Sequence, residues 1–199
     1  MKKLVIIIIP AIYFLSSFGP MATVKDFNYD VSLDGRPIGT YKVNKTDVNG
    51  TSNYRVETTT SAGLIRRAEH KFVMLSSYDQ SKLIASDIKT WVNEKLESST
   101  VIHWDGSQYV KQDGERLTEM CYDLVTYSSA CVYFEEPAGR SILFYEKYGK
   151  DLVVTDLGNH RYEVELPNGG VERYTYENGA VTKVEFVQTF ATITLNVTY

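Results

Sequence analysis

The chain has 199 residues, a formal net charge of −4, and 43% hydrophobic and 13% aromatic residues. Its length predicts one domain that buries about 70% of the surface exposed by the unfolded chain. The net charge is negative, and no basic cluster occurs beyond Arg66-Arg67. Nucleic acid and anionic membrane surfaces are therefore not expected as partners.

Residues 1–22 have the order of a secretory signal peptide: two lysines, an apolar run from Leu4 to Leu15, and then small and turn residues. The run is shorter than the roughly 20 residues of a membrane-spanning helix, and Pro10 interrupts it, so cleavage is favoured over an uncleaved anchor. We therefore expect a periplasmic or secreted protein that is not membrane-associated after cleavage. Its mature part is a single β-domain over 23–199.

Apolar and polar residues alternate along much of the mature chain. The stretch FNYDVSL (27–33) places Phe, Tyr, Val and Leu on one side and polar residues on the other, and the pattern recurs in YRVET (54–58), RYEVEL (161–166) and ITLNVTY (193–199). A period of two residues is typical of strands with one face in water.

Turn dipeptides separate these strands, and they accept the positive φ values of tight hairpins. They are Asp34-Gly35, Asn49-Gly50, Asp105-Gly106, Asp113-Gly114, Asn168-Gly169 and Asn178-Gly179. The expected strands are 26–33, 38–46, 53–61, 64–78, 83–94, 97–104, 108–112, 115–119, 131–134, 141–146, 152–157, 160–166, 171–177, 181–188 and 190–198. The fold class is therefore all-β, a single antiparallel meander with little helix.

Helix is expected only within 119–130, where there is room for a turn or two. Without an amphipathic helix to cover it, the apolar face of the sheet must be covered by the sheet itself, curled into a barrel, half-barrel or sandwich. A curled sheet with 15 Tyr and 8 Phe could hold a lipid-like or other apolar ligand in its hollow. Alternatively, these aromatic residues simply fill the interior.

Both cysteines lie in CYDLVTYSSACVYFEEP, at Cys121 and Cys131. In an oxidising compartment they are expected to form a disulfide, worth about 2.7 kcal/mol for a loop of about eleven residues. A metal site is not expected, because His103 and His160, the nearest histidines in sequence, are distant. No cofactor is expected either.

Trp91 and Trp104 are the candidate ligand-binding residues, because they lie in adjoining expected strands and tryptophan suits the mouth of a pocket. The preferred interpretation is structural, a contact across the strand pair.

No catalytic residue is expected. His70, His103 and His160 lack a neighbouring G-x-S-x-G motif and are interpreted as surface or cross-strand residues. Glu135 and Glu136 are adjacent, so on a strand they would point to opposite faces and not converge. They are interpreted as a solvated strand end before Pro137.

Three segments resemble an uncharacterised family of exported bacterial β-domains: LDGRPIGTYKV (33–43), VYFEEPAG (132–139) and YTYENG (174–179). The resemblance implies a fold similar to the curved antiparallel sheets of periplasmic lipoprotein carriers, and it implies no activity. Those carriers hold helices over their concave face as a lid, and in this chain only 119–130 could take that place.

The first hypothesis is thus an exported, non-enzymatic β-domain that binds an apolar ligand or an envelope partner. The alternative is a small outer-membrane barrel, since ITLNVTY ends on Tyr199 as the last strand of such barrels does. Against it, LIRRAEHKFVM (64–74) puts charges on both faces. A further alternative is an enzyme of unknown type, which only scattered polar residues support. The oligomeric state is open, because strand edges permit pairing.

Overall fold

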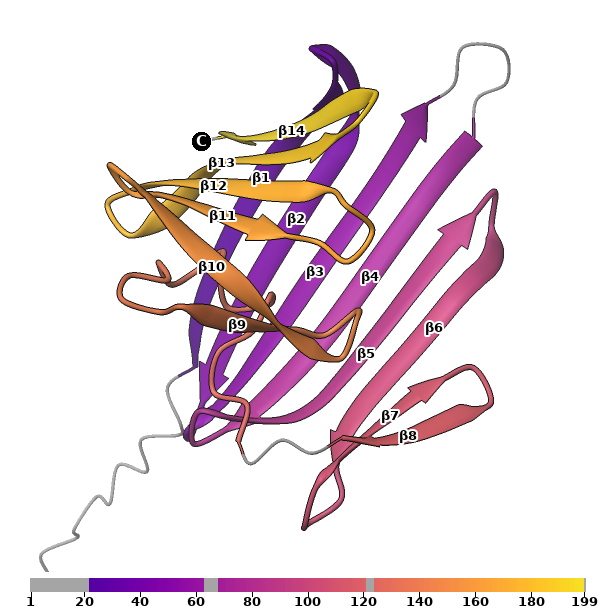
Figure 1. Cartoon of the computed structure of the whole chain (residues 1–199), viewed down its shortest axis with the longest axis vertical. Helices are drawn as coiled ribbons and strands as arrows, with labels where there is room; N and C mark the ends of the chain where they lie inside the picture. Colours follow the sequence, from indigo (N-terminus) through magenta and orange to yellow (C-terminus); the bar gives the residue numbers. More distant parts are fainter. Residues whose placement is uncertain (1–21, 63–67, 121–123, 199) are drawn as a thin grey trace, which may run out of the picture.

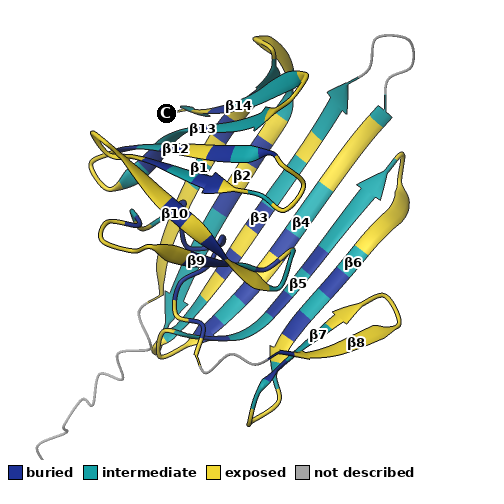
Figure 2. Cartoon of the chain, in the orientation of Figure 1, coloured by how far each residue is buried: buried dark blue, intermediate teal, exposed yellow. Residues whose placement is uncertain are grey.

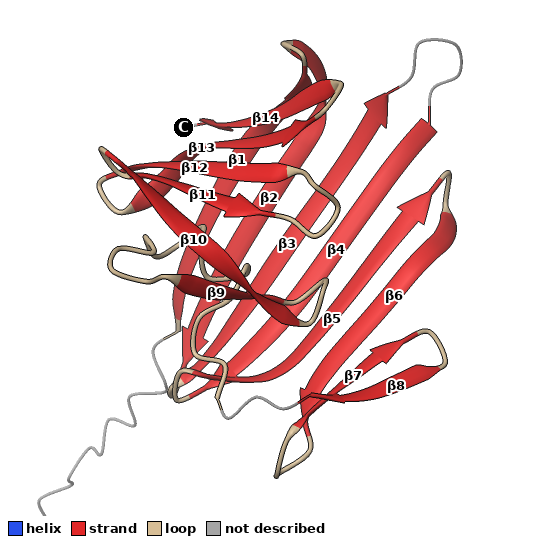
Figure 3. Cartoon of the chain, in the orientation of Figure 1, coloured by secondary structure: helices blue, strands red, loops and turns tan. Residues whose placement is uncertain are grey.

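The computed structural model describes residues 22–62, 68–120 and 124–198. These residues form one antiparallel sheet of fourteen strands in the order β8-β7-β6-β5-β4-β3-β2-β1-β14-β13-β12-β11-β10-β9 (Figures 1 and 3). Strands that follow one another in sequence pair with each other, except β8 and β9, and β1 also pairs with β14. The sheet is not closed, because β8 and β9 are its two edges.

The strands of the first half are β1 (Thr23–Leu33), β2 (Arg36–Val48), β3 (Thr51–Ala62), β4 (Ala68–Asp79), β5 (Lys82–Val92), β6 (Lys95–Trp104), β7 (Tyr109–Asp113) and β8 (Arg116–Met120). Those of the second half are β9 (Ile142–Tyr145), β10 (Lys150–Gly158), β11 (Arg161–Glu165), β12 (Val171–Glu177), β13 (Ala180–Gln188) and β14 (Ala191–Thr198). The expected all-β meander is confirmed.

Two expectations about the stretch between β8 and β9 are wrong. Residues 131–134 form turns instead of a strand, because Phe134 and Glu135 both donate their backbone N–H to the carbonyl of Cys131. No helix occurs in 124–130, where the chain is irregular. Local hydrogen bonds thus replace the ladder that the apolar sequence suggested.

The hairpin turns follow the expected chemistry and extend it. Asp34-Gly35, Asn49-Gly50 and Asn178-Gly179 have positive φ at both residues, as a type I′ turn requires. Gln80-Ser81 and Asn93-Glu94 adopt the same conformation without glycine. These two turns were not expected from dipeptides, although the strands on either side of them were.

The sheet curls so that β9–β14 lie over the face of the long strands β1–β4 (Figure 1). Its two ends come into contact at Gly149, in the turn between β9 and β10. A Cβ on Gly149 would lie 2.7 Å from Lys111 Cδ of β7 and 3.4 Å from Met120 Cε of β8. Side-chain contact at this point, without a hydrogen-bonded ladder, brings the two edge regions together.

The hollow of the curl is filled in part by an irregular stretch, residues 124–141, called here the inner segment. All seven residues of 127–133 are buried (Figure 2). Tyrosine hydroxyls of the sheet satisfy its backbone: Tyr176 donates to the Val132 carbonyl at 2.7 Å, and Tyr109 accepts from the Val125 N–H at 3.3 Å. The sheet is therefore covered partly by itself and partly by this segment, which occupies the place expected for a lid.

No helix among the described residues is long and apolar enough to cross a membrane. Of the expected leader, residues 1–21 lie outside the described part of the chain.

Candidate functional site

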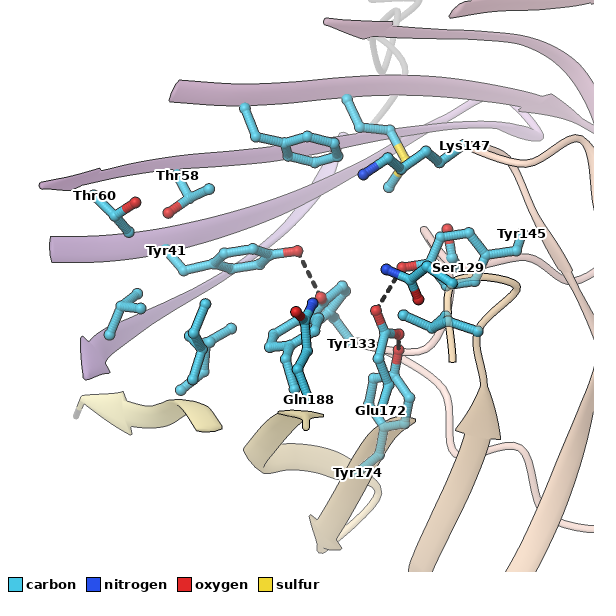
Figure 4. A pocket seen from close by; sticks show the side chains of 18 of the residues that line it. Tyr41, Thr58, Thr60, Ser129, Tyr133, Tyr145, Lys147, Glu172, Tyr174 and Gln188 are labelled. Carbon is cyan, nitrogen blue, oxygen red and sulfur yellow. Dashed lines mark hydrogen bonds between the residues drawn. The ribbon is translucent and has the colours of Figure 1, made fainter. Parts of the chain in front are cut away.

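A cavity of about 270 Å³ remains between the two walls of the curled sheet (Figure 4). Strands β1–β4 line one side and β13 and β14 the other, while the inner segment, β12 and the turns after β9 and β11 complete it. The lining is apolar along the strands and polar at one end.

The apolar wall consists of inward-facing residues that pair across neighbouring strands. Val31 is opposite Leu195 in the β1–β14 ladder, and both are buried. Phe186 is opposite Ile193 in the β13–β14 ladder, and both are half-buried. Such pairs bring apolar side chains close together on one face of a sheet, which explains why alternation in β1, β13 and β14 produces a continuous wall.

The polar end of the cavity is built around Glu172, a carboxylate on β12 that is only 2% exposed. The hydroxyl of Tyr145 donates to Glu172 Oε1 at 2.6 Å, and the hydroxyl of Tyr174 donates to Oε2. Close by, the hydroxyls of Tyr41 and Tyr133 lie 2.5 Å apart (Figure 4). We call these five residues the polar floor.

Burial dominates the electrostatics of the polar floor. It raises the pKa of Glu172, against the hydrogen bonds from Tyr145 and Tyr174 and the charge of Lys147, which lower it. Burial also raises the pKa of Tyr145 and Tyr174 well above its usual range, and the Glu172 charge adds to the effect. The tyrosines are therefore neutral hydrogen-bonding groups at physiological pH and do not act as bases.

The rim of the cavity is polar and open to solvent. Lys147, Asn168 and Gln188 are exposed, and each comes from a turn or a strand end. The cavity is therefore bordered by exposed polar side chains on the side where these turns and strand ends lie.

A second buried carboxylate, Glu146, fixes the inner segment beside the cavity. It accepts hydrogen bonds from the hydroxyls of Ser128 and Ser129 and from the Ser129 N–H at 3.0 Å. Tyr78 in turn donates to the Ser128 hydroxyl. Burial raises the pKa of Glu146, and these donors offset part of the cost of burying its carboxyl group. Because its partners belong to the inner segment, we assign Glu146 a structural role.

Cys131 is buried, and its Sγ lies 4.0 Å from Ser128 Oγ. Burial raises the pKa of its thiol, which makes it a poor nucleophile. It has no disulfide partner among the described residues, and Cys121 lies outside them, so the disulfide stays a prediction. No group of three or more potential metal ligands occurs in the described part of the chain.

The two tryptophans do not line this cavity, and the predicted contact between them is wrong. Trp91 is opposite Lys71 near one end of the β5–β6 hairpin, with Lys71 Nζ 5.6 Å from its ring. Trp104 is opposite Tyr109 at the other end, with Lys82 Nζ 3.2 Å from its ring. In an antiparallel hairpin the last residues of the two strands lie at opposite ends, which separates the pair.

The acidic pair and His160 form ion pairs and hydrogen bonds at or near the surface, with Glu135 exposed and Glu136 half-buried. Glu135 binds Arg140 at 2.7 Å, whereas Glu136 accepts from the Tyr162 hydroxyl at 2.7 Å and lies 2.9 Å from His160 Nδ1. The two carboxylates have different partners and do not converge, as expected, although they lie in an irregular part of the chain and not at a strand end. All three histidines are exposed.

The polar floor was missed because each of its residues was interpreted only as part of a strand. One sequence signal could have found it. In VERYTYE (171–177), Glu172 shares the alternation phase of Tyr174 and Tyr176, and these three residues are buried. A carboxylate in the inward phase of an amphipathic strand indicates a buried charge that needs partners.

No curated protein matches the chain in sequence. Among solved structures, it is similar to a β-barrel-like protein of the domain of unknown function DUF1849 from Brucella abortus, with 12% sequence identity, a TM-score of 0.49, and coverage of 90% of this chain and 95% of that one. The expected resemblance to an uncharacterised β-domain family is confirmed by a family model that matches residues 29–198, and the chain belongs to that family, described as a domain of unknown function (DUF6134).

Proposed function

We propose that this chain is an exported, non-enzymatic binding domain that holds one small amphipathic molecule in the hollow of its sheet. The observation that carries the proposal is the two-part lining of the cavity. An apolar body would lie against the Val31, Leu195, Phe186 and Ile193 wall, and a polar end would reach the Glu172 floor. Ligand pockets combine a mainly apolar lining with a few placed polar groups in this way.

The size of the cavity limits the ligand. At about 270 Å³ it lies just below the roughly 300–1,000 Å³ of small-molecule pockets. A single short acyl chain or a ring system suits this volume, and a two-chain lipid does not.

A cavity-filling variant tests the proposal. Thr58 of β3 is half-buried and lines the cavity, whereas its neighbour Thr59 faces outward and is exposed. We expect Thr58→Trp to weaken binding of the neutral probe N-phenyl-1-naphthylamine at least tenfold, because the indole occupies the ligand's space. The matched control Thr59→Trp should bind like the wild type, and the melting temperature of both variants checks their folding.

Native mass spectrometry of protein recovered from the exported fraction without detergent gives an independent test. Excess mass that dissociates as a small apolar species supports the proposal. A bare mass together with no probe binding would point to a role in binding an envelope partner. Recovery only in detergent would instead support the outer-membrane barrel.

A further inference from the structure

The hydrogen bonds of the polar floor leave one donor unused. Tyr41 and Tyr133 are 8% and 4% exposed, and both line the cavity. Their two hydroxyls share one hydrogen bond, which uses one of their two hydrogens. The second hydrogen has no acceptor among the described residues. A buried donor without a partner is costly. A ligand with an atom that accepts this hydrogen would therefore bind more tightly than one without.

Glu172 offers the complementary group. Each of its carboxylate oxygens accepts one tyrosine hydrogen, from Tyr145 or Tyr174, and each can accept one more. Glu172, Tyr41 and Tyr133 line the same cavity (Figure 4). The donor and the acceptor positions therefore belong to one site.

Three kinds of polar end can be compared at this site. A carboxylate can accept the free tyrosine hydrogen, but Glu172 repels it, and the exposed Lys147 at the rim gains little from a surface ion pair. An ammonium group can donate to Glu172 but cannot accept from the tyrosines. A hydroxyl does both, because it accepts one hydrogen bond and donates another.

We propose that the polar floor selects ligands with an uncharged hydroxyl end group, which accepts from the Tyr41–Tyr133 pair and donates to Glu172. This inference rests on the binding function proposed above for the same cavity. It adds the ligand class, namely short-chain alcohols over fatty acids and amines of equal length.

Three ligands that share one apolar chain test the inference on the wild-type protein: 1-octanol, octanoate and octylamine, each competing with N-phenyl-1-naphthylamine at neutral pH. We expect 1-octanol to bind at least tenfold more tightly than octanoate and more tightly than octylamine. Equal affinity for the three, or tightest binding of octanoate or octylamine, would overturn the inference while leaving the binding function intact. If neither the probe nor any ligand binds, both proposals fail.

A charge-removing variant identifies the residue responsible. Glu172→Gln keeps the shape of the side chain and removes its charge, so the preference for 1-octanol over octanoate should shrink to about threefold or less. Glu163→Gln is the matched control, because Glu163 lies on the neighbouring strand β11 and is bound to Arg173 at 2.7 Å. This control should keep the full preference, and a Glu172→Gln protein that also keeps it would overturn the role of Glu172.

Discussion

At the residue scale, the chain buries two carboxylates, and each receives its hydrogen bonds from a different kind of donor. Glu146 receives hydrogen bonds from hydroxyls and backbone N–H groups of the inner segment, whereas Glu172 receives only tyrosine hydroxyls. The hydrogen bonds to Glu146 hold the inner segment in place. Those to Glu172 keep acceptor positions facing a cavity, which is why we assign the binding role to Glu172 and not to Glu146.

The raised pKa of Glu172 predicts how stability depends on pH. Because the native state holds this proton more tightly than the unfolded chain, stability is fully present below the unfolded pKa of about 4.3 and is lost as pH rises through the native pKa. We expect Glu172→Gln to be more favourable, relative to the wild type, at pH 8 than at pH 5. Urea unfolding at the two pH values measures the difference, and a constant difference would contradict it.

At the element scale, the type I′ turns differ in how much strain they carry. Gly50 has φ of 83° with nothing within 4 Å of an added Cβ, so Gly50→Ala meets only the backbone cost of a left-handed residue. Glu94 already carries that cost at φ of 66°. We expect Gly50→Ala to lose about 1 kcal/mol and Glu94→Gly to gain up to about 1 kcal/mol, measured by thermal unfolding. Shifts of the same sign in both variants would contradict this reasoning.

The elements also show what the sequence could predict. Alternation and turn dipeptides were enough to locate β1–β14, because a strand with one wet face carries its own signal. The inner segment was predicted wrongly, with a strand over 131–134, since its backbone is satisfied by local turns and by tyrosines that are distant in sequence, such as Tyr176. The polar floor was hidden for the same reason: Tyr41, Tyr133 and Glu172 meet only after the sheet has curled.

At the scale of the whole molecule, β14 joins the two halves of the sheet. It pairs with β1 from Asn28–Thr198 to Leu33–Ile193 and with β13 on its other side. A chain that ends at Gln188 lacks this strand, so the walls of the cavity lose their connection. We expect such a truncated protein to have no cooperative urea transition.

Phe190→Ser in the full-length chain is the control for this truncation, because it changes a side chain in the deleted region that is 96% exposed. It should unfold like the wild type. A truncated protein that still unfolds in one cooperative urea transition, with a midpoint close to that of the full-length protein, would show that the two halves hold together without β14.

The pairing of β1 with β14 also bears on how the protein is made. The ribosome synthesises β1 before the other strands and β14 after them. The edge of β1 that pairs with β14 therefore stays unpaired through almost the whole of translation. Such non-local closure is slow, since it must bring distant parts of the chain together. For the export proposed above, this delay is useful: a translocation pore that threads extended polypeptide would receive a chain that has not yet been able to finish folding.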